Sequence, residues 1–236
     1  MRGGPIGPIA ILLLVACGPS EQHKAELAEQ KRLECLDKLC EGDVPPKRDP
    51  IQEEALKFNG QWFIGPKDYF STGINGAAFF WPSKTPARSN VPDFPEKAQV
   101  TSGHADEVTI AIFLRSHDGV MHGPTRYEAL RKAELEGRLV SKTSPRPGLE
   151  VWRVRDEVEG TAIWHVATNL KDANDEPPVL FCRGGRNPQS DKCTGAFIWM
   201  PGISVDFRFH NKHGPDWPEI HQEIVRVLQL LKKAST

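Results

Sequence analysis

The chain lacks the short signatures that mark the commonest catalytic sites. It contains no Gly-x-Ser-x-Gly elbow, no phosphate-binding loop and no Gly-x-Gly-x-x-Gly turn after a strand-like run. It also lacks an excess of one charge, because 30 lysines and arginines balance 31 aspartates and glutamates. No basic stripe of the kind that binds nucleic acid is visible. We therefore expect neither an enzyme, nor a cofactor, nor a nucleic-acid partner.

Long apolar runs are also missing, since a membrane-spanning helix takes about 20 apolar residues. The apolar run Ile6–Ala16 follows the positive charge of Arg2 and is typical of a signal peptide. Leu14-Val15-Ala16-Cys17 matches the lipobox of bacterial lipoprotein precursors, in which the cysteine is lipidated and becomes the first residue after cleavage. The alternative is an ordinary signal peptide with an accidental cysteine.

The lipobox predicts where the mature protein lies. We expect residues 1–16 to be removed and Cys17 to carry acyl chains, such as palmitate, that hold the protein on the periplasmic side of a bacterial envelope membrane. Several acyl chains together give stable anchoring. Gly18 follows the cysteine in place of an aspartate. By analogy with other bacterial lipoproteins, this favours the outer membrane over the inner membrane.

Cysteines are few, and after Cys17 only Cys35, Cys40, Cys182 and Cys193 remain. An even number of cysteines in an oxidising compartment predicts disulfides, and three pairings are possible. The simplest pairs Cys35 with Cys40 and Cys182 with Cys193. A four-cysteine zinc site is the competing interpretation, but the spacings do not fit paired short knuckles, so we expect no metal there.

Turn residues and hydrophobic periodicity divide the rest of the chain. We expect a lipidated N-terminus, helix and linker over 17–50, with the helix over Ser20–Leu39. A first α+β subdomain is expected over 51–140, with strands at 61–64, 77–81 and 108–114 and a helix over Tyr127–Leu139. Several prolines interrupt the linker and the loop Ser83–Glu96, which excludes continuous helix there.

Residues 141–236 have the pattern of an antiparallel meander followed by a helix. Strand-length apolar runs begin near Leu149 and continue over 161–168, 178–182, 196–200 and 204–209, each bounded by turn residues. A helix is expected from Asp216 or Trp217, with Asp216 as N-cap and an apolar stripe of Ile220, Ile224, Val227, Leu228 and Leu231. The predicted class is α+β, with antiparallel sheets, a C-terminal helix packed on one face and two candidate subdomains.

Candidate chemical residues are scattered through predicted loops and strands. His210, His213, Asp216 and His221 suggest a metal site, but a solvated turn between strand and helix is the favoured interpretation. His165 is expected to be a satisfied, half-buried strand residue rather than a general base. The aromatic runs 79–81 and 197–199 fit core packing better than a ligand groove, and Trp62 and Trp217 are candidate anchors for a partner. Ser71, Ser102, Ser116, His117, Asp118 and His122 have no recognisable catalytic context.

Three local phrases resemble a known group of proteins. They are Cys40-Glu-Gly-Asp-Val-Pro45, Asn59-Gly-Gln-Trp-Phe-Ile-Gly-Pro-Lys-Asp-Tyr69 and Phe79-Phe-Trp-Pro-Ser-Lys84. With the lipobox, they are similar to lipoprotein immunity proteins encoded beside type VI secretion phospholipase effectors. The resemblance covers roughly residues 40 to 84 and contains no catalytic signature.

The resemblance implies a protein that binds a phospholipase toxin in the periplasm and blocks it. Such a role needs a complementary surface with a few aromatic or arginine anchors and no active site. The loops Ser83–Glu96, Ser116–Thr125 and Arg183–Lys192 are candidates for insertion into a toxin cleft, although no contact residue carries over. An envelope-assembly or small-ligand-binding lipoprotein, and an unrecognised periplasmic hydrolase, are the alternatives.

Overall fold

Antiparallel strands make up most of the structure, which is a computed structural model and describes residues 21–37, 40–71, 75–87, 106–114, 126–156, 160–182 and 192–234. In chain order the elements are α1 (Glu21–Asp37), β1 (Glu53–Phe58), β2 (Gln61–Pro66), β3 (Phe70–Ser71), β4 (Gly76–Phe80), β5 (Glu107–Leu114), α3 (Arg126–Leu135), β6 (Leu139–Arg146), β7 (Leu149–Asp156), β8 (Gly160–Ala167), β9 (Val179–Cys182), β10 (Lys192–Met200), β11 (Ile203–His210), the 3-10 helix η1 (Asn211–Asp216), α4 (Trp217–Leu228) and β12 (Lys232–Lys233).

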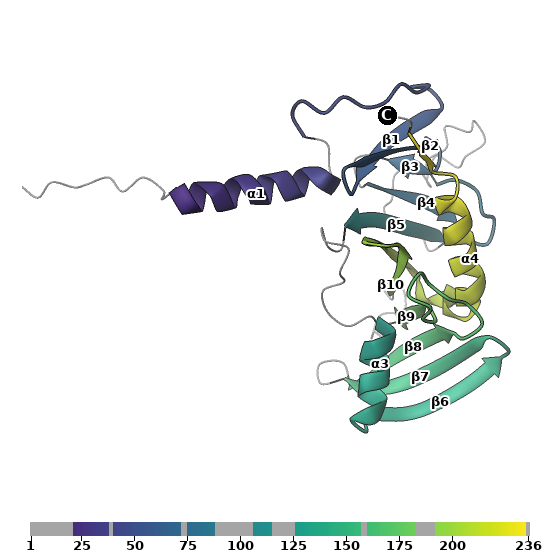
Figure 1. The fold of residues 1–236 in the computed structure, drawn as a ribbon. Helices are drawn as coiled ribbons and strands as arrows, with labels where there is room; N and C mark the ends of the chain where they lie inside the picture. The colour runs from purple at the N-terminus through teal and green to yellow at the C-terminus, as the bar shows by residue number, and fades with distance from the viewer. Residues whose placement is uncertain are drawn as a thin grey trace, which may run out of the picture.

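One broad sheet of nine strands dominates the fold, in the order β3-β4-β5-β11-β10-β9-β8-β7-β6 (Figure 1). The five strands β7 to β11 follow one another in sequence and in space, so the expected meander is confirmed. All of the pairings along the sheet are antiparallel. The second sheet is small and has the order β1-β2-β12. The predicted α+β class is confirmed.

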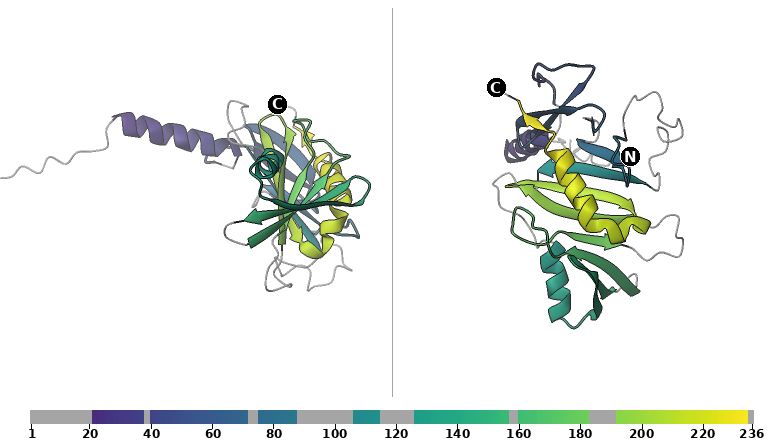
Figure 2. Two further views of the ribbon diagram at one scale, coloured as in Figure 1. Left: turned by 90° about the horizontal axis from the view of Figure 1, so that it is seen from below. Right: turned by 90° about the vertical axis from the view of Figure 1, so that its right-hand side faces the viewer.

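The amphipathic helix α4 covers one face of the large sheet (Figure 2). The expected stripe is buried, because Ile220, Ile224, Val227 and Leu228 are fully inaccessible and Leu231 is nearly so. Trp217 stacks on Phe207 of β11 with 4.7 Å between ring centroids. Burying these large side chains contributes roughly 1.5–3 kcal/mol each before entropy is counted, which fixes the helix to the sheet.

The shorter helix α3 lies on the opposite face, over β7 and β8 (Figure 2). Leu130 and Ala133 of α3 pack there with Trp152, Val154, Val166 and Val179 in a second, smaller core. The sheet therefore has buried layers on both faces. Apolar side chains of β7 point toward α3, and β8 contributes residues to both cores. The sequence had indicated a helix on one face only.

The boundaries of several elements differ from the prediction. The helix expected over Tyr127–Leu139 ends at Leu135, because Gly137 takes a left-handed conformation with φ 71° that stops a helix. The chain then starts a new strand, β6, which the sequence analysis had left out. β4 and β5 from residues 51–140 join the same large sheet as the strands from 141–236. The division into two subdomains near residue 140 stays a prediction.

Helix α1 extends away from the body of the protein (Figure 1). Its side chains are mostly exposed, and it carries local ion pairs such as Lys24 with Glu21 and Arg32 with Glu29. Its last turn is tied to the domain, since Gly60 donates its amide hydrogen to the carbonyl of Leu36 at 3.0 Å. None of the described helices is long and apolar enough to cross a membrane.

Candidate functional site

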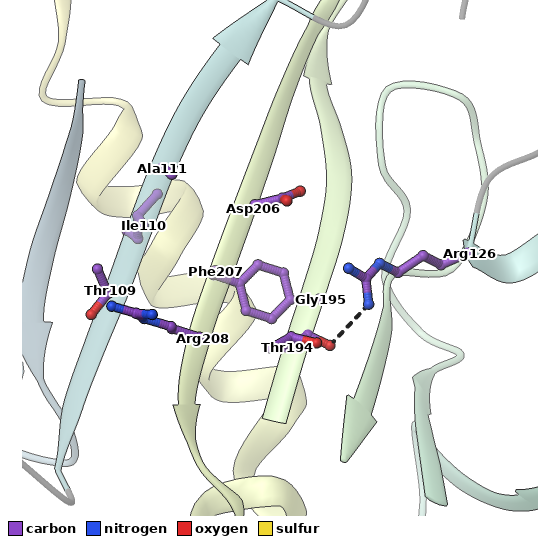
Figure 3. A pocket seen from close by; sticks show the side chains of 9 residues that line it. All are labelled: Thr109, Ile110, Ala111, Arg126, Thr194, Gly195, Asp206, Phe207 and Arg208. Carbon is purple, nitrogen blue, oxygen red and sulfur yellow. Dashed lines mark hydrogen bonds between the residues drawn. The ribbon is translucent and has the colours of Figure 1, made fainter. Parts of the chain in front are cut away.

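A groove lies on the face of the large sheet that α4 does not cover. It has a volume of about 420 Å³ and is lined by residues of β5, β10, β11 and the first residue of α3 (Figure 3). Pockets of roughly 300–1,000 Å³ are the size that binds small ligands or a protruding side chain of a partner. We call this feature the sheet groove.

Strand register places the residues on the floor of the sheet groove. Arg208 of β11 pairs with Thr109 of β5 on one side and with Thr194 of β10 on the other. One step along, Asp206 pairs with Ala111 and with a second small residue, Ala196. Directly opposed side chains share a face, so these residues form two rows across the sheet. Because the paired side chains on β5 and β10 are small, the charged side chains of Asp206 and Arg208 on β11 lie in a hollow.

A helix end supplies the wall of the sheet groove. Arg126, the first residue of α3, reaches across β10, and its Nη1 donates a hydrogen bond to the carbonyl of Thr194 at 3.3 Å (Figure 3). Arg208 is exposed on the other side of the same row. Two guanidinium groups therefore face a groove that also contains the carboxylate of Asp206. Such a mixture can bind polar and charged groups.

A second surface gathers aromatic and charged side chains beside α4. We define the Tyr69–Arg226 surface as Tyr69, Lys84 and Arg226, which lie beside the buried side chains of Trp81 and Glu223. The hydroxyl of Tyr69 donates to the carbonyl of Lys84 at 3.2 Å and accepts from Arg226 at the same distance. Glu223 is only 3% exposed and accepts from Arg226 at 2.6 Å, and this hydrogen bond raises the pKa of the guanidinium. Tyr, Trp and Arg are the residue types that dominate binding energy in interfaces.

The Tyr69–Arg226 surface continues into a group of charged residues around η1. Trp81 donates its indole hydrogen to Asp216 at 3.0 Å, and His213 lies between Asp216 and Asp106. Burial raises the pKa of the Asp106 carboxyl, but hydrogen bonds from Lys212 and His213 outweigh burial and hold that pKa below its ordinary value. This group joins the segment before β5 to the start of α4.

Asp216 occupies the N-cap position of α4, as expected, but its side chain makes no capping hydrogen bond. The carboxylate accepts from Trp81 instead, which links the loop after β4 to the helix. Pro218 stands in the first turn, where its missing amide hydrogen costs nothing. The start of the helix was therefore predicted correctly, and the role of its cap was not.

The histidines do not form a catalytic or metal-binding arrangement in the described residues. Burial lowers the pKa of His165 and of His221 to about 4, so both rings are neutral near pH 7. His165 is buried and its Nδ1 has no hydrogen-bond partner among the described residues, which corrects the expectation of a satisfied, half-buried ring. His210 accepts from the amide of Lys212 at the start of η1. In the part of the chain that the structure describes, no three ligand-type side chains gather as a metal site would require.

The ring of His213 lies 2.9 Å from Asp106 and 3.7 Å from Asp216. Within the described residues, the hydrogen bond of its ring joins Nε2 to the carboxylate of Asp106. A nucleophile must lie within hydrogen-bond reach of its base, although apo geometry is often loose. The contacts of His213 thus describe a link between chain segments.

Aromatic residues predicted for the core are there. Phe79 is fully buried, and Phe80, Trp81, Phe197 and Ile198 are all less than 9% exposed. Trp199 is only partly buried and packs against the main core. Trp217, a candidate partner anchor in the sequence, is also fully buried, so it cannot contact a partner. Trp62 is partly exposed and lies under the ammonium group of Lys57, 5.9 Å from the ring centroid.

The four cysteines form the two local disulfides that spacing favoured, Cys35–Cys40 and Cys182–Cys193. The first bond joins the end of α1 to the turn before β1. The second links directly paired positions of β9 and β10. The competing four-cysteine zinc site is therefore wrong.

Several expectations lie outside the described residues. These are the signal peptide 1–16, Cys17, the loops 116–125 and 183–191, most of the loop 83–96, and the residues Ser102, Ser116, His117, Asp118 and His122. Ser71 is described and ends the short strand β3. The described part of the first loop, residues 83–87, belongs to the Tyr69–Arg226 surface through Lys84.

Neither surface was predicted from the sequence. The polar half of the alternation in residues 203–210 contained a usable signal, because Asp206 and Arg208 point away from the core side chains between them. Which strands would flank β11 depended on long-range pairing, which alternation alone does not determine. Nothing in the sequence indicated that Tyr69 and Arg226, 157 residues apart, would share a hydrogen bond.

The fold defines the class of the molecule as an α+β protein built on one broad antiparallel sheet. No family profile and no curated protein sequence matches the chain. Among solved structures the chain is similar to Smlt3025, described as an immunity protein of the Stenotrophomonas maltophilia type IV secretion system. The two chains are 15% identical with a TM-score of 0.48, over 82% of this chain and 97% of the other. At these values the likeness establishes neither a family nor a function.

Proposed function

We propose that this chain is a periplasm-facing lipoprotein that binds and neutralises a type VI secreted phospholipase toxin. The observation that carries the proposal is the sheet groove, an open hollow of about 420 Å³ with Arg126 and Arg208 facing it. A groove of this kind can receive a protruding side chain of a partner, and inhibition by occlusion needs no chemistry of its own. A stable complex would bury about 800 Å² on each partner, more than the groove alone provides.

The residues behind the sequence resemblance have definite places in the fold. Asn59 and Gly60 take left-handed conformations in the β1–β2 turn, with φ of 51° and 66°. Asp43 pairs with Lys57 at 2.7 Å and secures the segment before β1. Tyr69 and Lys84 meet on the Tyr69–Arg226 surface. The resemblance thus involves turns that shape the N-terminal part and one exposed surface, which supports a binding role over a catalytic one.

The anchor is the second part of the proposal. A lipidated Cys17 would place the start of α1 at the membrane, and the 17-residue helix would add about 25 Å of length at 1.5 Å per residue. A toxin that attacks phospholipid works at that surface, so an anchored inhibitor meets it there. The two disulfides fit the oxidising compartment that the anchor implies. Metabolic labelling with palmitate should mark the wild-type chain and leave the C17S variant unmarked.

The solved structure of Smlt3025 is of the same broad kind by its description, but it is too distant to add weight. The proposal rests on the resemblance of residues 40–84, the lipobox and the open surfaces. Its finer parts, namely the phospholipase and the type VI pathway, come from the sequence resemblance.

The proposal is tested by co-expression in the periplasm. A lipase-like effector encoded beside this chain is directed to the periplasm with and without the full-length protein, and survival is counted. We expect the full-length chain to restore growth and the C17S variant to protect less at equal periplasmic level. A neighbouring effector whose toxicity is unaffected by the chain, or the lack of any such effector, overturns the proposal.

A second candidate is favoured by the same groove. Its volume also suits a small polar ligand, so the chain could be an envelope lipoprotein that holds such a molecule without catalysis. Native mass spectrometry of protein purified from the periplasm distinguishes the two. A bound small molecule that leaves when Arg208 is replaced by Ala supports this candidate, whereas an empty domain excludes it.

A further inference from the structure

Near one edge of the large sheet, β7 carries two arginines for which the described residues supply no ion-pair partner. Arg153 and Arg155 of β7 are exposed, and neither has an acidic partner among the described residues. They are two positions apart on one strand, so they point to the same face about 7 Å from each other. We call Arg153 and Arg155 the arginine pair.

Strand register places the arginine pair on the α4 face, beyond the reach of that helix. Arg153 pairs with Ile163 and Val151 with His165 of β8, and His165 belongs to the buried layer on that side. Trp152 and Val154, the alternate residues, point the other way into the core under α3. Nothing in the described part of the chain covers the guanidinium groups.

The neighbouring strand β6 forms the free edge of the sheet. It is the last strand in the order, and most of its residues are exposed. On the face of the arginine pair it carries short hydroxyl side chains, with Ser141 opposite Arg153 and Thr143 opposite Val151. Because strands lie about 4.8 Å apart, an arginine can extend over a serine or threonine to the edge. A segment docked on β6 would thus come within reach of Arg153. Arg155 lies two residues further along the same face of β7.

From this arrangement we infer that the β6 edge binds an extended acidic segment of a protein partner, which adds a tenth strand to the sheet. The main chain of the segment pairs with β6 around Ser141 and Thr143, between the two places where the register of β6 against β7 shifts, as in other cases of strand addition. Carboxylates at every second residue of the segment then meet the arginine pair, whose planar groups favour bidentate bonds to carboxylate. Pro145 has no amide hydrogen, which ends the pairing there.

The inference deepens the proposed function and rests on it only in taking the partner to be the toxin. The segment is recognised by charge and by strand pairing, so its affinity should fall as salt is raised. The surface is separate from the sheet groove, which lies on the opposite face of the sheet. A partner that contacted both the β6 edge and the sheet groove would bury more surface than either one provides alone.

Peptide binding tests the inference directly. The purified domain, residues 18–236, is titrated with the peptide Thr-Glu-Val-Glu-Thr-Glu-Val and with its glutamine counterpart. We expect the glutamate peptide to bind at least tenfold more tightly, and the R153Q/R155Q double variant to lose that preference. T143E, which adds a like charge on β6, should weaken binding as well. The matched control is K232Q/K233Q, which removes the same charge from exposed positions of β12.

The inference is overturned if R153Q/R155Q binds the glutamate peptide as the wild type does, or if both peptides bind equally. Arginine-dependent binding to anionic phosphatidylglycerol vesicles without peptide binding would also overturn it, because the surface would then recognise lipid. Failure here is distinct from failure of the proposed function. Protection from the toxin that survives R153Q/R155Q leaves the immunity role intact and removes only the docking edge.

Discussion

Two buried histidines connect the stability of this protein to pH. Burial lowers the pKa of His165 and His221 from 6.5 in the unfolded chain to about 4. Between pH 6.5 and pH 4 the unfolded chain therefore binds protons at these two histidines, whereas the folded protein does not. The contribution of these histidines to the free energy of unfolding is fully present above pH 6.5 and is lost as the pH falls toward 4. Each histidine lowers the free energy of unfolding by roughly 3 kcal/mol between pH 6.5 and pH 4.

Replacing His221 should remove part of this acid sensitivity. His221 packs between Phe197 and Trp217, and neither of its ring nitrogens has a hydrogen-bond partner in the described structure. H221L should keep stability at pH 7 and lose less of it by pH 4.5, as measured by urea denaturation at a series of pH values. H23Q on the exposed helix α1 is the control. An unchanged pH slope in H221L would show that the ring is not the group that titrates.

A single glycine marks the closest contact in the core under α4. A Cβ added at Gly195 would lie 1.9 Å from the ring of Phe207, which occupies the space of the missing side chain. G195A should destabilise the fold by roughly 1–3 kcal/mol through overpacking. Adding F207L should recover part of the loss, since the shorter side chain vacates that space. Chemical denaturation measures both, and a double variant no better than G195A contradicts the explanation.

Residue-level features were readable from the sequence when they depended on local pattern. The apolar stripe of α4 and the local disulfides follow from helical spacing and short loops. The hydrogen bond of Asp216 to Trp81, the burial of Trp217 and the pairing of Tyr69 with Arg226 depend on which segments meet in space. A local sequence pattern contains no information about contacts between distant segments, so these contacts could not be predicted.

At the level of elements, the two disulfides should contribute unequally to stability. Cys182–Cys193 joins β9 to β10 with both sulfurs buried in the main core. Cys35–Cys40 joins the end of the exposed α1 to a turn, and such segments can open without the rest of the fold. We expect C182A/C193A to lose about 3 kcal/mol in denaturant unfolding and C35A/C40A clearly less. Equal losses would mean that α1 unfolds together with the sheet.

The elements themselves show where periodicity works and where it fails. The meander β7–β11 and the helix α4 have clean patterns, and both were predicted. β6 was missed because its residues are largely exposed and polar, so it lacks the apolar alternation that identifies a strand. β1 was missed for a related reason, since charged residues interrupt its run. Exposed edge strands carry little hydrophobic signal.

The whole molecule combines a broad sheet, covered by α4 on one face and in part by α3 on the other, with a polar helix that leads away from it. The order of the strands could not be predicted from the sequence, because β5 pairs with β11 across nearly 100 residues of chain. The pairing of β5 with β11 creates the sheet groove, so the groove could not be predicted from local sequence patterns either. What the sequence did supply is the expected membrane anchor and the expected binding role.

The most direct test of that role is titration of phospholipase activity. The purified effector from the neighbouring gene is assayed on phospholipid vesicles with increasing amounts of the soluble domain, residues 18–236. The account predicts that activity falls linearly and ends near one domain per enzyme, and that R208A weakens this inhibition. Full phospholipase activity at a tenfold molar excess of a folded domain would contradict it.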